Sequence, residues 1–128
     1  MRRTLWIGGL VAALSLAACG GGGGGGGGGN VTCSPSGTTI NVVAKNFTFD
    51  KACYAAPAGQ PFTVQFDNKD SAPHNFAIYT DSSIGKALSK PPTITSTRTT
   101  YQVKALTAGT YYFQCDVHTS MNGTFIVK

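Results

Sequence analysis

The chain has 128 residues, of which 41% are hydrophobic and 12% charged, and its formal net charge is +5. This length predicts one small domain. The basic residues are scattered, with neither a basic run nor interleaved aromatic and basic residues, so no nucleic-acid partner is expected. Without the two arginines near the N-terminus, eight basic and five acidic residues leave +3. That charge fits general solubility, or a weak preference for an acidic protein partner.

Residues 1–18 have the features of a secretory signal peptide. The first three residues carry two arginines, and residues 5–13 form an apolar segment too short to span a membrane. Leu16-Ala-Ala-Cys19 resembles a bacterial lipobox, which implies cleavage before Cys19 and attachment of lipid to its sulfur. The alternative is an ordinary signal peptide cleaved after Ala18. We therefore expect an exported protein at the cell envelope, in the periplasm or on the outer face of a membrane, anchored through Cys19.

Ten glycines, Gly20–Gly29, follow this cysteine directly. Such a segment cannot be buried and predicts a flexible tether, with an r.m.s. length of about 17 Å. It either lets an anchored domain move between partners or only holds the domain clear of the surface. The chain thus divides into a signal peptide (1–18), a lipidated cysteine with its tether (19–30) and one folded domain (31–128).

Alternating apolar residues predict the strands of the folded domain, and nothing in it has a convincing helical period. Residues 82–89 are expected to form at most one short turn of helix. Seven or eight short strands in about a hundred residues predict an all-β, two-sheet Greek-key sandwich. The expected strands are Ile40–Ala44, Phe47–Phe49, Phe62–Phe66, Asn75–Tyr79, Thr99–Val103, Tyr111–Cys115 and Thr124–Val127.

Four side chains suited to a soft transition metal stand at suggestive spacing. Cys115, His118 and Met121 lie on one short connection between two expected strands, and His74 precedes another strand. His74 and His118 are the only histidines in the chain. Each residue alone has an ordinary explanation, because a lone Cys or Met usually fills a core and a His after proline usually lies in a loop. Together, a thiolate, two imidazoles and a thioether predict one copper ion.

Two cysteines remain, Cys33 and Cys53. In an exported protein they are expected to form a disulfide, although both could be free. The bridge would fix the N-terminal segment of the domain and contribute about 3 kcal/mol.

The segment Gly109–Val127 resembles the C-terminal end of a small cupredoxin, and Pro73-His74-Asn75 resembles the upstream ligand motif of that family. The Cys-x2-His-x2-Met spacing is similar to the short amicyanin-type loop rather than the longer plastocyanin-type loop. The resemblance implies a Greek-key sandwich in which His74, Cys115 and His118 are equatorial copper ligands and Met121 is the axial ligand. It also implies that Asn75 ties the two ligand loops together through hydrogen bonds.

Two residues depart from the family pattern. Thr119 stands where many short-loop members have proline, and Asp116 directly follows the cysteine. We expect the Asp116 carboxylate to face solvent. The resemblance also implies a partner-facing patch around the edge of His118, expected to include Ala55, Ala56, Pro57, Ala72, Pro73 and Met121.

These features predict a mononuclear blue-copper protein that carries single electrons between transient redox partners, and a monomer is expected. The alternative is an envelope protein for copper trafficking, storage or resistance. Such proteins often have extra Met or His clusters, and only Met121 and two histidines follow the signal segment. An enzyme is not expected, because a second copper centre would need further histidines or a second nearby cysteine.

Overall fold

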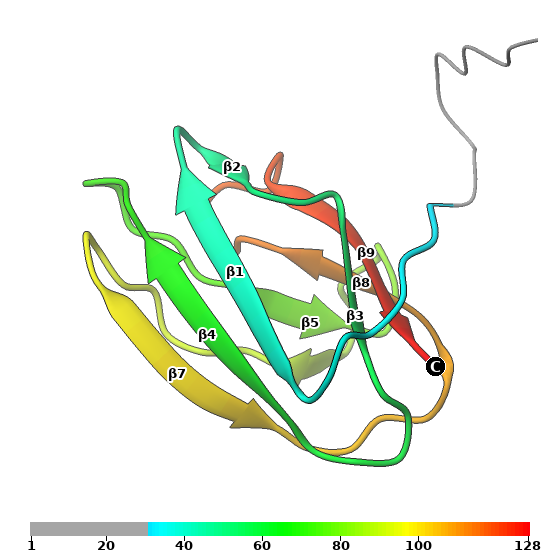
Figure 1. Cartoon of the computed structure of the whole chain (residues 1–128). Coiled ribbons are helices and arrows are strands. Elements are labelled where there is room, and N and C mark those ends of the chain that lie inside the picture. The colour runs from blue at the N-terminus through cyan, green and yellow to red at the C-terminus, as the bar shows by residue number, and fades with distance from the viewer. Residues whose placement is uncertain (1–30) are drawn as a thin grey trace, which may run out of the picture.

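The computed structural model describes residues 31–128 (Figure 1). The predicted signal peptide of residues 1–18, lipidation at Cys19 and the tether of residues 19–30 lie outside the described residues. Within residues 31–128, no helix is long and apolar enough to cross a membrane. Regular structure in this part of the chain consists of nine β-strands, which confirms the all-β prediction.

The first sheet has four strands in the order β2-β1-β4-β7. Strand β1 pairs in parallel with β4, whereas β4 pairs antiparallel with β7, so the sheet is mixed. In this sheet, β1 and β2 are the one pair of strands joined by a tight turn. The turn has two residues, because Lys45 pairs with Thr48. The strands are β1 (Thr39–Lys45), β2 (Thr48–Phe49), β4 (Phe62–Asn68) and β7 (Arg98–Val103).

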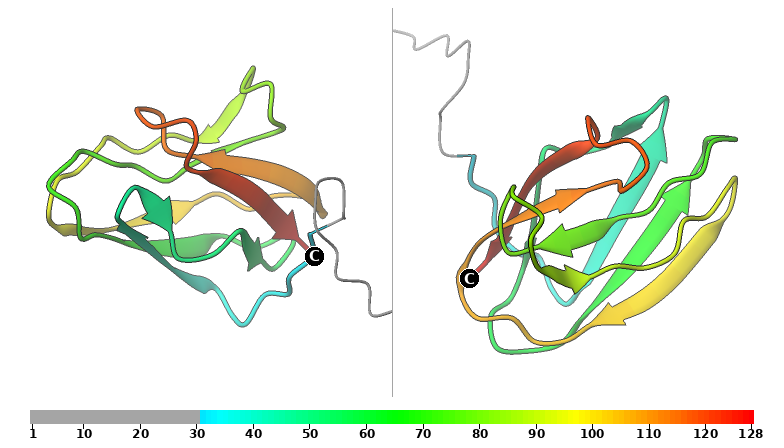
Figure 2. Two further views of the ribbon diagram at one scale, coloured as in Figure 1. Left: turned by 90° about the horizontal axis from the view of Figure 1, so that it is seen from above. Right: turned by 180° about the vertical axis from the view of Figure 1, so that it is seen from behind.

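The second sheet has five strands in the order β3-β9-β8-β5-β6. Strand β3 is parallel to β9, and the other neighbours are antiparallel. The two sheets pack face to face (Figure 2), which confirms the predicted sandwich. The strands are β3 (Cys53–Ala56), β5 (Ala77–Tyr79), β6 (Ala87–Ser89), β8 (Gly109–Gln114) and β9 (Asn122–Val127).

Alternation along the strands decides which side chains fill the space between the sheets. In β4, Phe62, Val64 and Phe66 are buried, while the residues between them are more exposed. From the facing sheet, Phe113 packs against Phe76 with ring centroids 4.9 Å apart. These two rings are fully buried, beside the start of β5 and the end of β8. The aromatic core therefore supports the backbone on which the predicted metal ligands lie.

Two short strands were not predicted. Strand β3 pairs through its backbone with β9, but its sequence, Cys-Tyr-Ala-Ala, shows no alternation of polar and apolar residues, although Tyr54 and Ala56 are buried. The helical turn expected over residues 82–89 was wrong, because residues 87–89 form β6 and pair with β5. The preceding residues 81–86 form a turn, in which the Thr80 amide donates to the Lys86 carbonyl at 3.1 Å.

A disulfide joins Cys33 to Cys53, the two cysteines left for pairing by the sequence analysis. Their sequence separation is 20 residues. The bond attaches the N-terminal segment of the domain to the first residue of β3. This segment has no regular structure before β1, so the disulfide is the covalent link that holds it against the sandwich.

Three connections meet at one end of the sandwich, the upper end in Figure 1. They are the β1–β2 turn, the segment that leads into β5 and the β8–β9 loop. The β3–β4 connection lies at the other end, where the Ala58 amide donates to the carbonyl of Lys128 at the C-terminus. All four predicted metal ligands fall on the first group of connections.

Candidate metal centre

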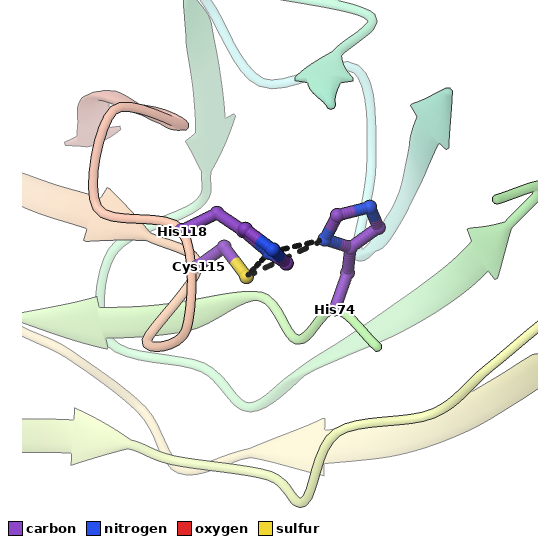
Figure 3. A group of neighbouring side chains, drawn as sticks. All are labelled: His74, Cys115 and His118. Carbon is purple, nitrogen blue, oxygen red and sulfur yellow. Dashed lines mark hydrogen bonds between the residues drawn. The ribbon is translucent and has the colours of Figure 1, made fainter. Parts of the chain in front are cut away.

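Three donor atoms from distant parts of the chain converge in the interior (Figure 3). His74 comes from the segment before β5, whereas Cys115 and His118 come from the β8–β9 loop. His74 and Cys115 are fully buried, and His118 is partly exposed. Among residues 31–128, these three form the one group of His, Cys and carboxylate side chains placed to share a metal ion.

The three donor atoms form a compact triangle in which the two nitrogens lie closer to each other than to the sulfur. Nδ1 of His74 lies 3.0 Å from Nδ1 of His118, and Cys115 Sγ lies 3.7 Å and 3.8 Å from these two nitrogens. The point equidistant from the three atoms is about 2.0 Å from each, close to the length of metal–imidazole and metal–thiolate bonds. The donor set and its spacing therefore fit one copper ion.

Backbone hydrogen bonds of Met121 close the β8–β9 loop that carries Cys115 and His118. The Met121 amide donates to the His118 carbonyl, and the Met121 carbonyl accepts from the Cys115 amide, both at 2.9 Å. The Met121 side chain is buried, with 3% of its surface exposed. These bonds fold residues 115–121 into a compact loop that brings a thiolate, an imidazole and a thioether together.

The segment between β6 and β7 braces the His74 side of the site. His74 and Ile94 form an isolated antiparallel bridge, with amide-to-carbonyl distances of 3.0 Å and 2.9 Å. Buried Asn68, the last residue of β4, donates side-chain hydrogen bonds to the carbonyls of Ala72 and Ile94 at 2.9 Å and 2.7 Å. The sequence offered no interpretation of this proline-containing segment, whose role becomes visible only through its backbone contacts.

Asn75 connects the two ligand-bearing segments, as the resemblance implied. Its side-chain oxygen accepts from the Asp116 amide at 2.8 Å. Its side-chain nitrogen donates to the Pro91 carbonyl at 2.9 Å and to Asp116 Oδ2 at 2.8 Å. Since Asn75 follows one predicted ligand and Asp116 follows another, these bonds fix the separation of His74 and Cys115.

The expectation that the Asp116 carboxylate faces solvent was wrong. It accepts hydrogen bonds from the side chains of Asn75, Tyr79 and Gln114, and it is only partly exposed. Partial burial acts to raise the pKa of Asp116, but these hydrogen bonds outweigh it and leave the pKa below its usual value. Sequence reasoning missed this outcome because the donors come from β5, β8 and the His74 segment.

Asp70 is a functional candidate that the sequence did not reveal. Its Oδ2 lies 2.8 Å from Nε2 of His74, on the opposite side of the imidazole from the converging Nδ1. The backbone N–H of Phe47 and then that of Asn46, together with His74, hold the pKa of Asp70 below its usual range despite partial desolvation. An ionised carboxylate here accepts a hydrogen bond from Nε2–H of His74, which leaves Nδ1 free to bind metal.

The residues expected to form a partner-facing patch do not all lie at the metal-centre end of the molecule. Ala56 is fully buried and hydrogen-bonded to Lys128 at the far end of the molecule, so the prediction of Ala55, Ala56 and Pro57 in the patch was wrong. Met121 is also buried, whereas Ala72 and Pro73 remain at the site end. The exposed apolar residues near the metal ligands are instead Phe47, 53% exposed, and Val117, 52% exposed.

Comparison with known proteins agrees with this geometry. The family described as "Cupredoxin-like domain" matches residues 11–127. The chain is 22% identical to an auracyanin of Roseiflexus castenholzii, with a TM-score of 0.66 over 73% of this chain and 99% of that one. For auracyanin A of Chloroflexus aurantiacus, a "blue" copper protein, the identity is 19% and the TM-score 0.63, over 70% and 98% of the two chains.

The fold is also similar to amicyanin from Paracoccus versutus, at 22% identity and a TM-score of 0.55. That alignment covers 73% of this chain and 84% of amicyanin. No curated protein sequence matches the chain. The match over most of its length shows that the chain belongs to the cupredoxin-like family, with His74, Cys115, His118 and Met121 positioned to form its copper site.

Proposed function

We propose that this protein is a mononuclear blue-copper electron carrier. The observation that carries the proposal is the convergence of one buried thiolate and two imidazole nitrogens, from Cys115, His74 and His118, around a single point. These three residues, together with buried Met121, would hold the copper ion. When bound, copper supplies a one-electron couple between Cu(I) and Cu(II).

Rigidity of the ligand frame supports electron transfer, because a site that changes little between two oxidation states needs little reorganisation. Asn75 fixes the distance between the two ligand segments, and Asp70 orients His74. Backbone hydrogen bonds of Met121 to Cys115 and His118 hold the β8–β9 loop closed. The chain therefore contributes an ordered set of donors around which few atoms must move.

His118 is proposed to be the point where electrons enter and leave. It is partly exposed, whereas His74 and Cys115 are fully buried. Redox partners are expected to bind briefly over a small area, as is usual for such encounters. One metal-binding group among residues 31–128 supports a carrier rather than an enzyme with a second copper centre. We expect the carrier to act as a monomer.

Voltammetry of the copper-loaded protein tests this function. A reversible one-electron wave is expected for the parent protein. Replacing Cys115 with serine is expected to abolish the sulfur-to-copper charge-transfer colour, whereas Met121→Gln should keep a coloured site with a lower potential. A Cys115→Ser variant that stayed blue would show that the ligand assignment is wrong.

Copper exchange separates the carrier from the trafficking alternative. A carrier should retain copper through many redox cycles and pass it only slowly to a competing chelator. Rapid release of Cu(I) to a chelator of moderate affinity, together with an irreversible wave, would favour trafficking or storage.

We also propose export of the protein and its attachment to a membrane through lipid on Cys19. The support is the order of charged, apolar and lipobox-like segments before that residue. The alternative remains an ordinary signal peptide cleaved after Ala18. Mass spectrometry of the protein from its native membranes should find lipid on Cys19, and Cys19→Ser should release the protein into the soluble fraction. A soluble parent protein with an unmodified N-terminal cysteine would contradict the anchor.

A further inference from the structure

Phe47 has a backbone conformation that its side chain does not favour. Asn46 and Phe47 are the two central residues of the β1–β2 turn, and their φ angles are 54° and 58°. Tight turns of this kind require positive φ at both positions, which suits asparagine and glycine. For a bulky aromatic residue such a φ is a genuine outlier and costs conformational energy. Because the Phe47 side chain is 53% exposed, burial in the core does not explain the residue.

The ring of Phe47 instead contacts both imidazoles of the metal centre. Its centroid lies 5.4 Å from that of His74 and 5.0 Å from that of His118, with interplanar angles of 88° and 84°. Both contacts have the edge-to-face geometry that aromatic rings prefer. Of the three rings, that of His74 is fully buried and that of Phe47 is the most exposed. The Phe47 ring thus forms an outer cover over part of the ligand pair.

One carboxylate links this cover to a metal ligand. Asp70 Oδ1 accepts the Asn46 amide at 2.7 Å, and Oδ2 accepts the Phe47 amide at 2.9 Å. The same Oδ2 lies 2.8 Å from Nε2 of His74. The two amides belong to the two positive-φ residues of the turn, so the Asp70 carboxylate binds both the turn and the imidazole.

The backbone of Asp70 is itself fixed on both sides. Its amide donates to Asn68 Oδ1 at 2.9 Å. Its carbonyl accepts from both the amide and the hydroxyl of Ser96, each at 3.0 Å. Ser96 also has a positive φ, 48°. A carboxylate held this firmly can impose a conformation on the groups that it contacts.

We propose that Asp70 is a positioning residue that fixes His74 as its Nε2–H tautomer and, through the Asn46–Phe47 turn, holds the Phe47 ring as a cover over both imidazoles. This inference rests on the proposed copper site, but its geometry concerns only the protein's own atoms. The cover limits access of solutes to the ligands. It also makes the Phe47 ring part of the surface that an approaching partner contacts at the partly exposed ligand His118.

NMR of the metal-free protein tests the geometry without reference to copper. The parent is expected to show His74 as the Nε2–H tautomer and proton contacts between the Phe47 ring and both imidazole rings. In Asp70→Asn, the new side chain keeps the size of Asp70 but offers one acceptor and an NH2 donor. The amide cannot accept from all three donors, because its NH2 faces either the Asn46 amide or both the Phe47 amide and Nε2–H of His74. The Nε2–H tautomer of His74 should therefore lose population, and the ring contacts of Phe47 should weaken.

Asp67→Asn is the matched control. The Asp67 carboxylate interacts with Lys69 at 3.3 Å and Arg98 at 3.2 Å, and it is not bonded to the turn or to His74. Its replacement should leave the tautomer and the ring contacts unchanged. An Nδ1–H tautomer of His74 in the parent, or the absence of Phe47 contacts there, would overturn the proposal even if the Asp70 variant did not fold.

Copper removal by a chelator then tests the consequence. Asp70→Asn should speed removal about tenfold, the usual scale for loss of a residue that orients a ligand. Phe47→Asn should also speed removal, because asparagine accepts the positive φ but lacks the ring, while His74 keeps its tautomer. Equal rates in Phe47→Asn and the parent would show that the ring is no cover. A parent that shows the predicted NMR geometry but binds no copper would refute the proposed function and leave the geometry of Asp70 and Phe47 established.

Discussion

Replacing Asn75 with alanine should destabilise the domain more than any ordinary surface substitution. The Asn75 side chain is 2% exposed and takes part in three hydrogen bonds. Two of them involve neutral backbone groups, the Pro91 carbonyl and the Asp116 amide, and the third ends on the Asp116 carboxylate. Alanine removes all three hydrogen bonds and leaves the Pro91 carbonyl and the Asp116 amide and carboxylate without these hydrogen-bond partners.

The expected loss follows from the kind of bond removed. Each neutral hydrogen bond contributes about 1 kcal/mol, and a hydrogen bond to a charged group contributes about 1.5–3 kcal/mol. The free energy of unfolding should therefore fall by about 4 kcal/mol, a large share of the roughly 5–15 kcal/mol typical of a native protein. For a domain of about one hundred residues, this corresponds to a decrease in Tm of roughly 15–30 °C.

Urea unfolding of the metal-free protein measures this loss directly, with Asn122→Ala as the control. Asn122 is exposed, and its side chain donates one hydrogen bond, 2.8 Å long, to the Thr119 carbonyl within the same ligand loop. Its removal should cost no more than about 1 kcal/mol. If the Asn75 variant unfolded at the same urea concentration as the Asn122 variant, Asn75 would not be the link that holds the two segments together.

Three other perturbations have defined outcomes. Cys33→Ser removes the disulfide and should lower the free energy of unfolding by about 3 kcal/mol in urea titrations; an unchanged midpoint would contradict this. Gly123→Ala would place a Cβ in a clash with the Ala52 carbonyl oxygen and the Phe113 ring, so calorimetry should show a cost of about 1–3 kcal/mol, and an unchanged Tm would refute the clash. Burial, followed by the hydrogen bond to Asp116, raises the pKa of Tyr79 to about 12. The hydrogen-bonded Tyr79 hydroxyl therefore contributes its full share to the free energy of unfolding below pH 10, and this share is lost as the pH rises to about 12. The stability advantage of the parent over Tyr79→Phe should shrink across that range. A constant difference would show that the hydroxyl is not buried against Asp116.

Sequence alone was sufficient for the architecture because the strongest signals were local. In β4, alternation of Phe62, Val64 and Phe66 follows directly from burial of one strand face, and the structure confirms it. Strands β3 and β6 escaped prediction because they are short and are defined by backbone pairing, β3 with the distant β9 and β6 with β5 across the turn of residues 81–86. The Phe47–Phe49 strand was predicted one residue too early, since Phe47 belongs to the turn.

The metal-binding residues were predictable for a chemical reason. Thiolate, imidazole and thioether groups at short spacing are rare, so their pattern is informative without a structure. The groups that orient them were not predictable. Asp70, Asn46 and Phe47 are common residue types, and their relation to His74 arises only when the β1–β2 turn meets the segment before β5. The orientation of Asp116 was likewise set by Tyr79 on a neighbouring strand.

Titration of the purified protein with Cu(II), followed by ascorbate, tests the central claim most directly. The convergence of Cys115, His74 and His118 predicts an intense blue absorption band that saturates at one copper per chain. Ascorbate should bleach the band, and reoxidation should restore it. A folded protein that develops no colour with Cu(II), or that saturates only at two copper ions per chain, would contradict a mononuclear thiolate site.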